Sequence, residues 1–357
     1  MKKESFVFSK RSIQSFQTIW EAPSNIALVK YWGKYGIQLP KNPSISFTLS
    51  NCTTTTEVIF SPSDKKRYPT FEFYFNKKER SDFYPKINLF FVRILPYLPT
   101  LQNYHLKISS SNSFPHSSGI ASSASAMAAL ALCIVDFEKQ FHHELSDQDF
   151  LMKASFLARI GSGSASRSIK GPLTLWGRSP AFKDSSDLYA IPFESSVNNI
   201  FKSYCNTILI VDEGKKQVSS SVGHQLMQNH PFAENRFDQA HRNCELLKSV
   251  FKLGDIEKFI QITESEALSL HAMMMTSSPG YILMQPNTLN IINKVWEYRF
   301  QTKIPLSFTL DAGPNVHLLY PKSEKDKVMA FIKSDLIDYC QIGQFIEDKV
   351  GQGAKKI

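Results

Sequence analysis

The sequence contains few cysteines, and their arrangement excludes several common uses of this residue. The five are Cys52, Cys133, Cys205, Cys244 and Cys340, and no CxxC pair is present. Without such pairs a zinc or redox site is not indicated, and an odd number of cysteines argues against a disulfide framework. We interpret them as reduced thiols, most of them buried.

Signals for a membrane segment, for secretion and for nucleic-acid binding are also missing. Apolar runs stay short of the roughly 20 residues that span a bilayer. The start, MKKESFVFSKRSIQSFQTIW, has no continuous apolar segment, so we read no secretory signal and expect a cytoplasmic protein. The net charge of +9 is spread along the chain, without a dense basic helix. We therefore expect neither a membrane nor a nucleic acid as partner, whereas a small polyphosphate would fit this charge.

What is present is an ordinary globular composition, long enough for two domains. The chain has 357 residues, of which 42% are hydrophobic and 20% charged, without a repeat or a low-complexity linker. Strand patterns occur at 53–60, 70–76, 104–112, 206–214, 304–310 and 316–321. Helical patterns occur at 86–98, 146–160, 232–251, 256–275, 287–300 and 323–334. Because strands and helices mix in both halves, we predict two α+β layers with a ligand cleft between them.

One stretch, SFPHSSGIASSASAMAALAL at 113–132, combines hydroxyls and a glycine with the start of an alanine-rich helix. The first turn of a helix has unpaired N–H groups and a partial positive charge, which attract phosphate. Glycine allows close approach of the backbone, and serine hydroxyls can bind phosphate oxygens or Mg²⁺. The candidate residues are Ser118, Gly119, Ser122 and Ser123, with Ser122 as the candidate Mg²⁺ ligand. A capped, buried helix without a ligand is the alternative, and a P-loop is excluded because GxxxxGK[ST] is missing.

Three further segments carry polar residues beside apolar strands or small-residue loops. GSGSASRS at 161–168 contributes Ser162, Ser164 and Arg167, whose planar guanidinium suits a carboxylate or a phosphate. APSNIALVKYWGK at 22–34 contributes Asn25, Lys30, Tyr31 and Lys34, and TLDAGPNVH at 309–317 contributes Asp311. Each has an ordinary alternative: a plain loop, a strand-end lysine that reaches solvent, and a turn-forming aspartate.

The order of these motifs resembles the diphosphomevalonate decarboxylase family of the GHMP kinase superfamily. The matching segments are APSNIALVKYWGK, NPSISFTLS, FPHSSGIASSASA, ARIGSGSASRSIKG, TLDAGPN and the terminal DKVGQGA. The resemblance implies an α+β GHMP kinase fold, with an N-terminal α/β domain like domain 2 of ribosomal protein S5 and a ferredoxin-like C-terminal domain. We expect the domains at 1–195 and 196–340, with 341–357 returning toward the first.

The resemblance also implies an enzyme that uses MgATP to phosphorylate the tertiary hydroxyl of mevalonate diphosphate. Phosphate and CO2 then leave, giving isopentenyl diphosphate. Asp311 would face the hydroxyl, and Lys30 would keep the Asp311 carboxylate ionised. Arg167 with Asn25 would bind the substrate carboxylate. The serines at the helix start would hold the ATP phosphates. The diphosphate would lie on Tyr31, Lys34, Ser162, Ser164, Ser220 and Ser221. The family further implies a homodimer.

The chain also departs from the family pattern. Relatives often have cysteine in place of Ser166, and some have arginine near Ser221 and methionine near His224, so Ser220 and Ser221 must supply hydroxyls instead. His116 and His224 match no catalytic position of the family. Three alternatives remain open: a kinase that stops after phosphorylation, a decarboxylase of the monophosphate, and an inactive nucleotide-binding scaffold.

Overall fold

The computed structural model describes residues 14–64, 69–115, 120–141, 144–193, 196–214 and 218–357. Its N-terminal half is built on a long antiparallel sheet in which β5 and β7 form the parallel pair. The strand order is β14-β1-β4-β7-β5-β6, and β8 and β9 continue from β4. The strands are β1 (Phe16–Ala27), β4 (Ser44–Pro62), β5 (Thr70–Phe75), β6 (Lys78–Glu79), β7 (Tyr104–Asn112), β8 (Leu173–Trp176), β9 (Ile191–Pro192) and β14 (Lys355–Lys356). A small separate hairpin joins β2 (Lys34–Tyr35) to β3 (Leu39–Pro40).

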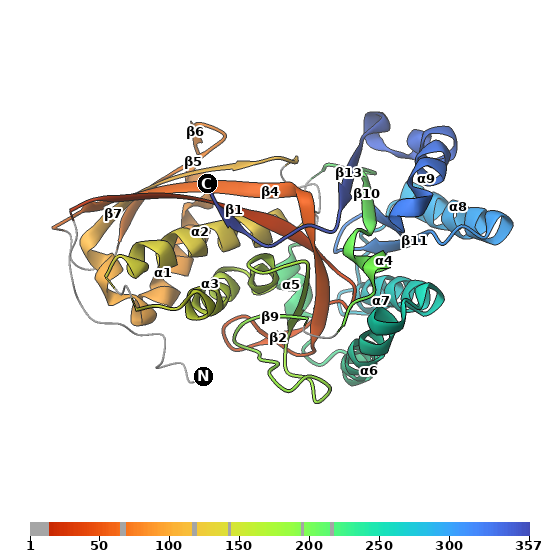
Figure 1. Cartoon of the computed structure of the whole chain (residues 1–357), viewed down its shortest axis with the longest axis horizontal. Helices are drawn as coiled ribbons and strands as arrows, with labels where there is room; N and C mark the ends of the chain where they lie inside the picture. The colour runs from red at the N-terminus through yellow and green to blue at the C-terminus, as the bar shows by residue number, and fades with distance from the viewer. Residues whose placement is uncertain (1–13, 65–68, 116–119, 142–143, 194–195, 215–217) are drawn as a thin grey trace.

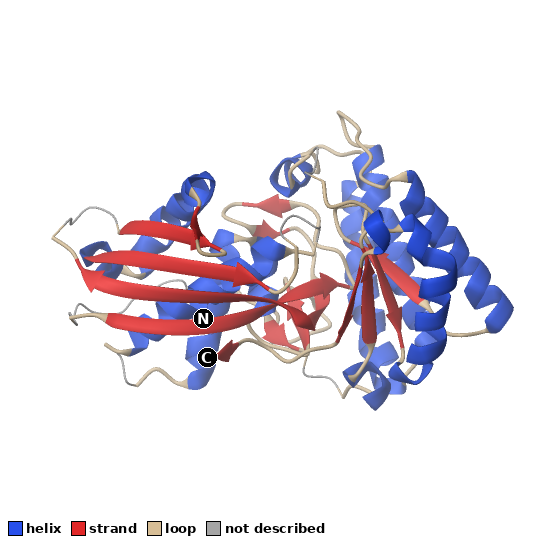
Figure 2. Cartoon of the chain, turned by 90° about the horizontal axis from the view of Figure 1, so that it is seen from above, coloured by secondary structure: helices blue, strands red, loops and turns tan. Residues whose placement is uncertain are grey.

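Three helices, α1 (Tyr84–Ile94), α2 (Ser122–Lys139) and α3 (Asp147–Gly161), lie against one face of this sheet (Figures 1 and 2). α2 occupies the middle of this layer, and its Ala124, Ala128 and Ala131 are fully buried. Because alanine has no side chain beyond Cβ, α2 can approach the sheet and α3 closely. The alanine-rich helix expected from the sequence is therefore a central packing element of this half.

The C-terminal half contains a second sheet, β11-β12-β10-β13, in which every pairing is antiparallel. Its strands are β10 (Cys205–Leu209), β11 (Ser307–Leu310), β12 (Val316–Tyr320) and β13 (Phe345–Lys349). The helices are α4 (Asn199–Lys202), α5 (Ser220–Gln225), α6 (Ala233–Leu253), α7 (Ile256–Met275), α8 (Pro286–Thr302) and α9 (Lys325–Phe331). This βαββαβ succession, with the first strand between the third and the fourth, is the ferredoxin-like order. That prediction is confirmed.

Most predicted elements are present, and the differences have local causes. Ser146 caps α3 at the start of the predicted helix, because its Oγ accepts the Asp149 N–H at 3.1 Å. The helix predicted at 86–98 ends at Ile94, and Pro96 and Pro99 start short 3-10 turns instead, since proline lacks the N–H that a helix needs. The segment 163–168, predicted as a loop, is a 3-10 helix. Residues 332–336, inside the last predicted helix, form a π-helical turn.

The two halves share a hydrophobic cluster, so they are packed together rather than only linked. Ile26 and Phe47, near the ends of β1 and β4, belong to the same buried cluster as Phe251, Phe259 and Leu319 of the C-terminal half. The chain then returns: β13 is followed by backbone hydrogen bonds along β4, and β14 pairs with β1. Among the described residues, no helix is long and apolar enough to cross a membrane.

Asp348 of β13 holds this return against the bend in β4. Its carboxylate accepts the backbone N–H groups of Ser50, Asn51 and Cys52 at 2.8, 2.9 and 2.8 Å. The side chain is buried, so the three donors have a protein partner in place of water. One carboxylate therefore satisfies three backbone donors at the junction of the two halves.

We predict that Asp348→Ala lowers the free energy of unfolding by about 1–3 kcal/mol, because buried N–H donors lose their acceptor. Urea denaturation followed by circular dichroism measures this change. Glu347→Gln is the matched control, since the neighbouring Glu347 forms a half-exposed ion pair with Lys325. Equal stability of the two variants would contradict the role given to Asp348.

Candidate active site

A cavity of about 590 Å³ lies between the two halves and receives side chains from both. Twelve of the fourteen predicted site residues line it: Asn25, Lys30, Tyr31, Lys34, Ser122, Ser123, Ser162, Ser164, Arg167, Ser220, Ser221 and Asp311. The other two, Ser118 and Gly119, lie outside the described residues, as does His116. Segments separated by nearly the whole chain thus meet around one space.

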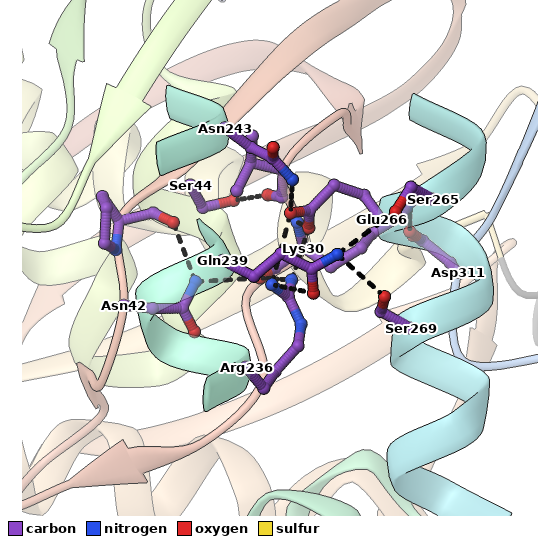
Figure 3. Close-up of polar contacts among 12 residues, drawn as sticks. Lys30, Asn42, Ser44, Arg236, Gln239, Asn243, Ser265, Glu266, Ser269 and Asp311 are labelled. Carbon is purple, nitrogen blue, oxygen red and sulfur yellow. Dashed lines mark hydrogen bonds and ion pairs between the residues drawn. The ribbon is translucent and has the colours of Figure 1, made fainter. Parts of the chain in front are cut away.

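An ion pair between the buried Lys30 and the partly exposed Asp311 joins the two halves at the wall of this cavity (Figure 3). The Lys30 Nζ lies 3.0 Å from the Asp311 Oδ1, and Lys30 is 1% exposed. Burial lowers the pKa of Lys30 below its ordinary value, and the Asp311 carboxylate opposes this shift. The ordinary alternative, a strand-end lysine that reaches solvent, is wrong, because β1 ends at Ala27 and the ammonium faces Asp311, the neighbour that the family resemblance implies.

Arg167 is part of the cavity wall, with its guanidinium oriented by two polar neighbours. Its Nη1 donates to the Ser44 Oγ at 2.6 Å, and its Nε donates to the Asn25 Oδ1 at 3.3 Å. The Asn25 amide is itself fixed, because its Nδ2 donates to the Ser168 Oγ at 2.8 Å. Burial lowers the pKa of Arg167 to about 10, and Asp311 opposes the shift, so the guanidinium stays charged at neutral pH. The structure therefore brings Asn25, Arg167 and Asp311 to one site.

A further part of the cavity wall is formed by cations and hydroxyls. Burial and the charge of Arg93 lower the pKa of Lys34, whose Nζ donates to the Gln38 Oε1 at 3.2 Å. The Tyr31 hydroxyl is buried and has no hydrogen-bond partner in the described part of the chain. Because an unpaired buried hydroxyl is costly, a ligand oxygen in this cavity would satisfy it. This wall thus fits an anion with several acceptor oxygens.

Sequence reasoning missed two cations of this wall, Lys86 and Arg93 of α1, together with Ser219 at the start of α5. Residues seven apart lie on one face of a helix, so the spacing of Lys86 and Arg93 was the available signal. It was overlooked because the segment 86–98 was interpreted only by its helical spacing.

The start of α2 opens into the same cavity. Ala121 precedes the helix in the left-handed region, with φ 48° and ψ 36°, and no side chain caps the first turn. The first N–H groups therefore lack a capping partner from Ala121, which is the arrangement that binds anions at helix starts. Ser123 lies 3.3 Å, oxygen to oxygen, from Ser162, so the helix start adjoins the serine-rich 3-10 segment. A smaller, mostly apolar cavity of about 80 Å³ continues from Ser122 and Ser123 toward Phe73, Phe75 and Phe83.

His224 also lines the cavity, although its chemistry differs from that of a catalytic base. Its Nδ1 accepts the Gly33 N–H at 3.0 Å, and its ring lies 4.3 and 4.6 Å from the rings of Tyr31 and Trp32. Burial, together with Lys34 and Arg167, lowers the pKa of His224 to about 3. The imidazole is thus neutral at physiological pH and supports the Tyr31–Gly33 segment.

The fold and the cavity can now be compared with known proteins. Residues 22–190 match the family described as "Diphosphomevalonate decarboxylase-like N-terminal domain", and residues 206–356 match "Mevalonate 5-diphosphate decarboxylase C-terminal domain". The chain is 32% identical over 326 residues to the diphosphomevalonate decarboxylase of Candida albicans, covering 87% of this chain and 86% of that protein. It is 31% identical over 328 residues to the Saccharomyces cerevisiae enzyme of the same name, covering 87% and 79%.

Solved structures agree with these relatives. The mevalonate diphosphate decarboxylase of Staphylococcus aureus superposes with a TM-score of 0.82 at 30% identity, over 96% of this chain and 98% of that one. A structure described as "MDDEF in complex with MVAPP, AMPPCP and Magnesium" gives a TM-score of 0.82 at 28% identity, over 96% and 99%. The fold is thus the two-domain α+β GHMP kinase fold. Within this class, the chain belongs to the diphosphomevalonate decarboxylase family.

We predict that the His224 ring stays neutral from about pH 8 to about pH 5, because its folded-state pKa lies far below the ordinary value of about 6.5. The unfolded chain takes up this proton below about pH 6.5, so the group lowers folding stability as the pH falls. Nitrogen-15 NMR of labelled histidine rings measures the protonation, and His224→Met assigns the resonance. A midpoint near pH 6.5 would contradict the prediction.

Proposed function

We propose that this chain catalyses the ATP-dependent decarboxylation of mevalonate diphosphate to isopentenyl diphosphate, with release of ADP, phosphate and CO2. The observation that carries the proposal is the Lys30–Asp311 ion pair, which shares one cavity with Arg167 and with the start of α2. The family membership supports it, as does the similarity to a structure described as a complex with MVAPP, AMPPCP and magnesium. The reaction would make the chain a carbon–carbon lyase of the mevalonate pathway.

The ATP phosphates would lie on the first turn of α2, where Ser122 and Ser123 add hydroxyl donors to the backbone N–H groups. The adjoining apolar cavity beside Phe73 and Phe83 fits the base. Among the described residues, no three His, Cys, Asp or Glu side chains could hold a metal ion together. A Mg²⁺ bound mainly by phosphate oxygens, with the Ser122 hydroxyl, fits this donor set. The ion would neutralise part of the negative charge of the ATP phosphates.

The substrate would occupy the remainder of the cavity. Arg167, oriented by Asn25, would bind the carboxylate in two-pronged geometry. The diphosphate would lie on the part of the cavity wall that contains Tyr31, where its oxygens would accept a hydrogen bond from the Tyr31 hydroxyl. Its other proposed contacts are Lys34, Ser162, Ser164, Ser220 and Ser221, and we add Lys86 and Arg93. Lys86 and Arg93 would supply the positive charge that some relatives obtain from an arginine near Ser221.

The chemistry then follows from the positions of Asp311, Lys30 and Arg167. Asp311 would accept the proton of the tertiary hydroxyl while the hydroxyl oxygen bonds to the terminal phosphorus of ATP and the bond from that phosphorus to ADP breaks. Lys30 would balance the negative charge at this point. Phosphate is a far better leaving group than hydroxide, so the carbon–oxygen bond breaks with positive charge on the tertiary carbon. The electron pair of the bond to the carboxylate closes the new double bond, and CO2 leaves. Arg167 holds that carboxylate in line with the emptying orbital.

Three further proposals concern the organisation of the protein. We propose domains at 1–195 and 196–340 with a closing segment at 341–357, supported by family matches at 22–190 and 206–356 and by the pairing of β14 with β1. We propose a reducing, cytoplasmic environment, supported by five cysteines that are all free and buried. A homodimer is supported by the family resemblance, and light scattering measures it.

We predict that the protein with MgATP and mevalonate diphosphate yields ADP, phosphate and CO2 in equal amounts. Coupled assays for ADP and phosphate, together with trapping of labelled CO2, measure the three products. Mevalonate and mevalonate phosphate are tested in parallel. ADP with a stable phosphorylated product and no CO2 would indicate the kinase alternative. A preference for mevalonate phosphate over mevalonate diphosphate would indicate the monophosphate decarboxylase and contradict the proposed diphosphate contacts.

We predict that Asp311→Asn lowers kcat by roughly 100-fold to 10,000-fold, because the hydroxyl loses its proton acceptor. Binding of the nucleotide analogue AMPPCP, measured by calorimetry, is expected to persist. Asp335→Asn, at an exposed aspartate outside the cavity lining, is the control. Turnover of Asp311→Asn at the rate of this control would refute the proposed role.

A further inference from the structure

The backbone of Lys30 is held as firmly as its side chain, by residues of α6 and α7 (Figure 3). The Lys30 N–H donates to the Glu266 Oε2 at 2.8 Å. The Lys30 carbonyl accepts the Arg236 Nη2 at 3.3 Å and the Asn42 Nδ2 at 2.9 Å. Both polar groups of one residue's backbone are thus bound by a single ion pair, Arg236–Glu266.

This ion pair is fully enclosed and has its own supports. Glu266 is 0% and Arg236 3% exposed. The Glu266 Oε1 accepts the Arg236 Nη1 at 3.2 Å and the Asn243 Nδ2 at 2.6 Å, and the Oε2 accepts the Arg236 Nη2. Gln239 links α6 to α7 by donating to Ser265 and Ser269. The carboxylate therefore accepts four N–H donors, and one of the four is the backbone of the proposed catalytic lysine.

The placement matters because Lys30 belongs to the N-terminal half. In the chain Lys30 follows shortly after β1. Its ammonium, its N–H and its carbonyl nevertheless all contact residues of the C-terminal half. An ion pair that served only to join α6 to α7 would not need the Lys30 backbone. A pair that also fixes that backbone sets where the ammonium lies relative to Asp311.

We propose that the Arg236–Glu266 ion pair is a positioning element for the reaction, which fixes the backbone of Lys30 and thereby keeps its ammonium on Asp311. The inference rests on the proposed function and adds two residues to it, neither of which lines the cavity. Small displacements of a reacting group can cost on the order of 100-fold in rate. The pair therefore acts through Lys30, without contact to the substrate.

Electrostatics adds a second signature that a purely structural ion pair would lack. Burial lowers the pKa of Lys30, Asp311 and Glu266 raise it, and Arg167 lowers it. Two histidines complete the surroundings: His271 of α7 contacts the Asp311 carbonyl, and burial lowers the pKa of His317 of β12 to about 4. Arg236 faces the Lys30 carbonyl. Removing the charge of Glu266 would lower the pKa of Lys30 further, so the alkaline limb of the kcat profile would move to lower pH.

The same helix offers a matched control. Glu264, two residues before Glu266 on α7, forms an ion pair with Arg299 of α8 at 2.6 Å and accepts the Trp296 indole N–H at 2.8 Å. Glu264→Gln breaks a mostly buried glutamate–arginine pair of α7 that touches neither Lys30 nor the cavity. Its cost falls on stability alone.

The experiment compares wild type, Glu264→Gln and Glu266→Gln. We expect Glu266→Gln to lower kcat on the order of 100-fold with KM for both substrates nearly unchanged, since only the reacting geometry is altered. Its alkaline limb moves down by about 1 pH unit. Glu264→Gln keeps the wild-type kcat and pH profile. Glu266→Gln with kinetics and a pH profile like those of Glu264→Gln would overturn the proposal.

A double variant separates positioning from folding. In Arg236→Met with Glu266→Gln, no unpaired buried charge remains, so the thermal midpoint rises above that of Glu266→Gln. Positioning keeps kcat low in this protein, because the Lys30 backbone still lacks its ionic partners. Return of kcat to the wild-type value together with the midpoint would assign the pair a structural role only.

A readout independent of turnover distinguishes failure of this inference from failure of the proposed function. Carbon-13 NMR of protein with ε-carbon-13 lysine, recorded at a series of pH values and assigned with Lys30→Met, reports the pKa of Lys30 without a reagent that must reach the buried ammonium. We expect a lower midpoint in Glu266→Gln than in Glu264→Gln. Equal midpoints would overturn the inference, whereas absence of decarboxylation in the wild-type protein would overturn the proposed function and leave the NMR result standing.

Discussion

A lysine ammonium withdrawn from water requires a carboxylate, and in this protein the two groups come from different halves of the chain. Desolvation disfavours the charged form of Lys30, and only the proximity of acidic groups offsets that penalty. Asp311 reaches the lysine only if the ferredoxin-like half is packed against the ends of β1 and β4. The shared hydrophobic cluster and the ion pair therefore depend on each other.

Around this pair the cavity is mostly cationic, and its cations are held in different ways. Arg167 is fixed by Ser44 and Asn25, whereas the Lys34 ammonium donates to the Gln38 side chain. A fixed guanidinium suits a group whose orientation decides the outcome, such as a carboxylate that must leave along one direction. A longer, less constrained lysine suits a diphosphate, which needs charge more than direction.

The short motifs carry a family resemblance, and that resemblance allowed the fold class, the ferredoxin-like half and the twelve cavity residues to be proposed. Lys86 and Arg93 escaped, since a cation on an amphipathic helix has the same pattern whether it faces solvent or a cavity. Glu266 and Arg236 escaped for a different reason. They lie on two helices that read as ordinary packing elements, and only tertiary structure shows that both reach the backbone of Lys30. The pairing of Lys30 with Asp311, 281 positions away, was expected only through the family resemblance, because the residues around each of them in the sequence do not indicate the other.

The return of the chain end to β1 has a consequence for biosynthesis. Trp20 and Glu21 pair with Lys356 and Lys355, so the first long strand receives its outer neighbour from beyond the whole C-terminal half. A ribosome still translating the C-terminal half thus carries an N-terminal sheet with this part of its border unpaired, a surface that other chains can join.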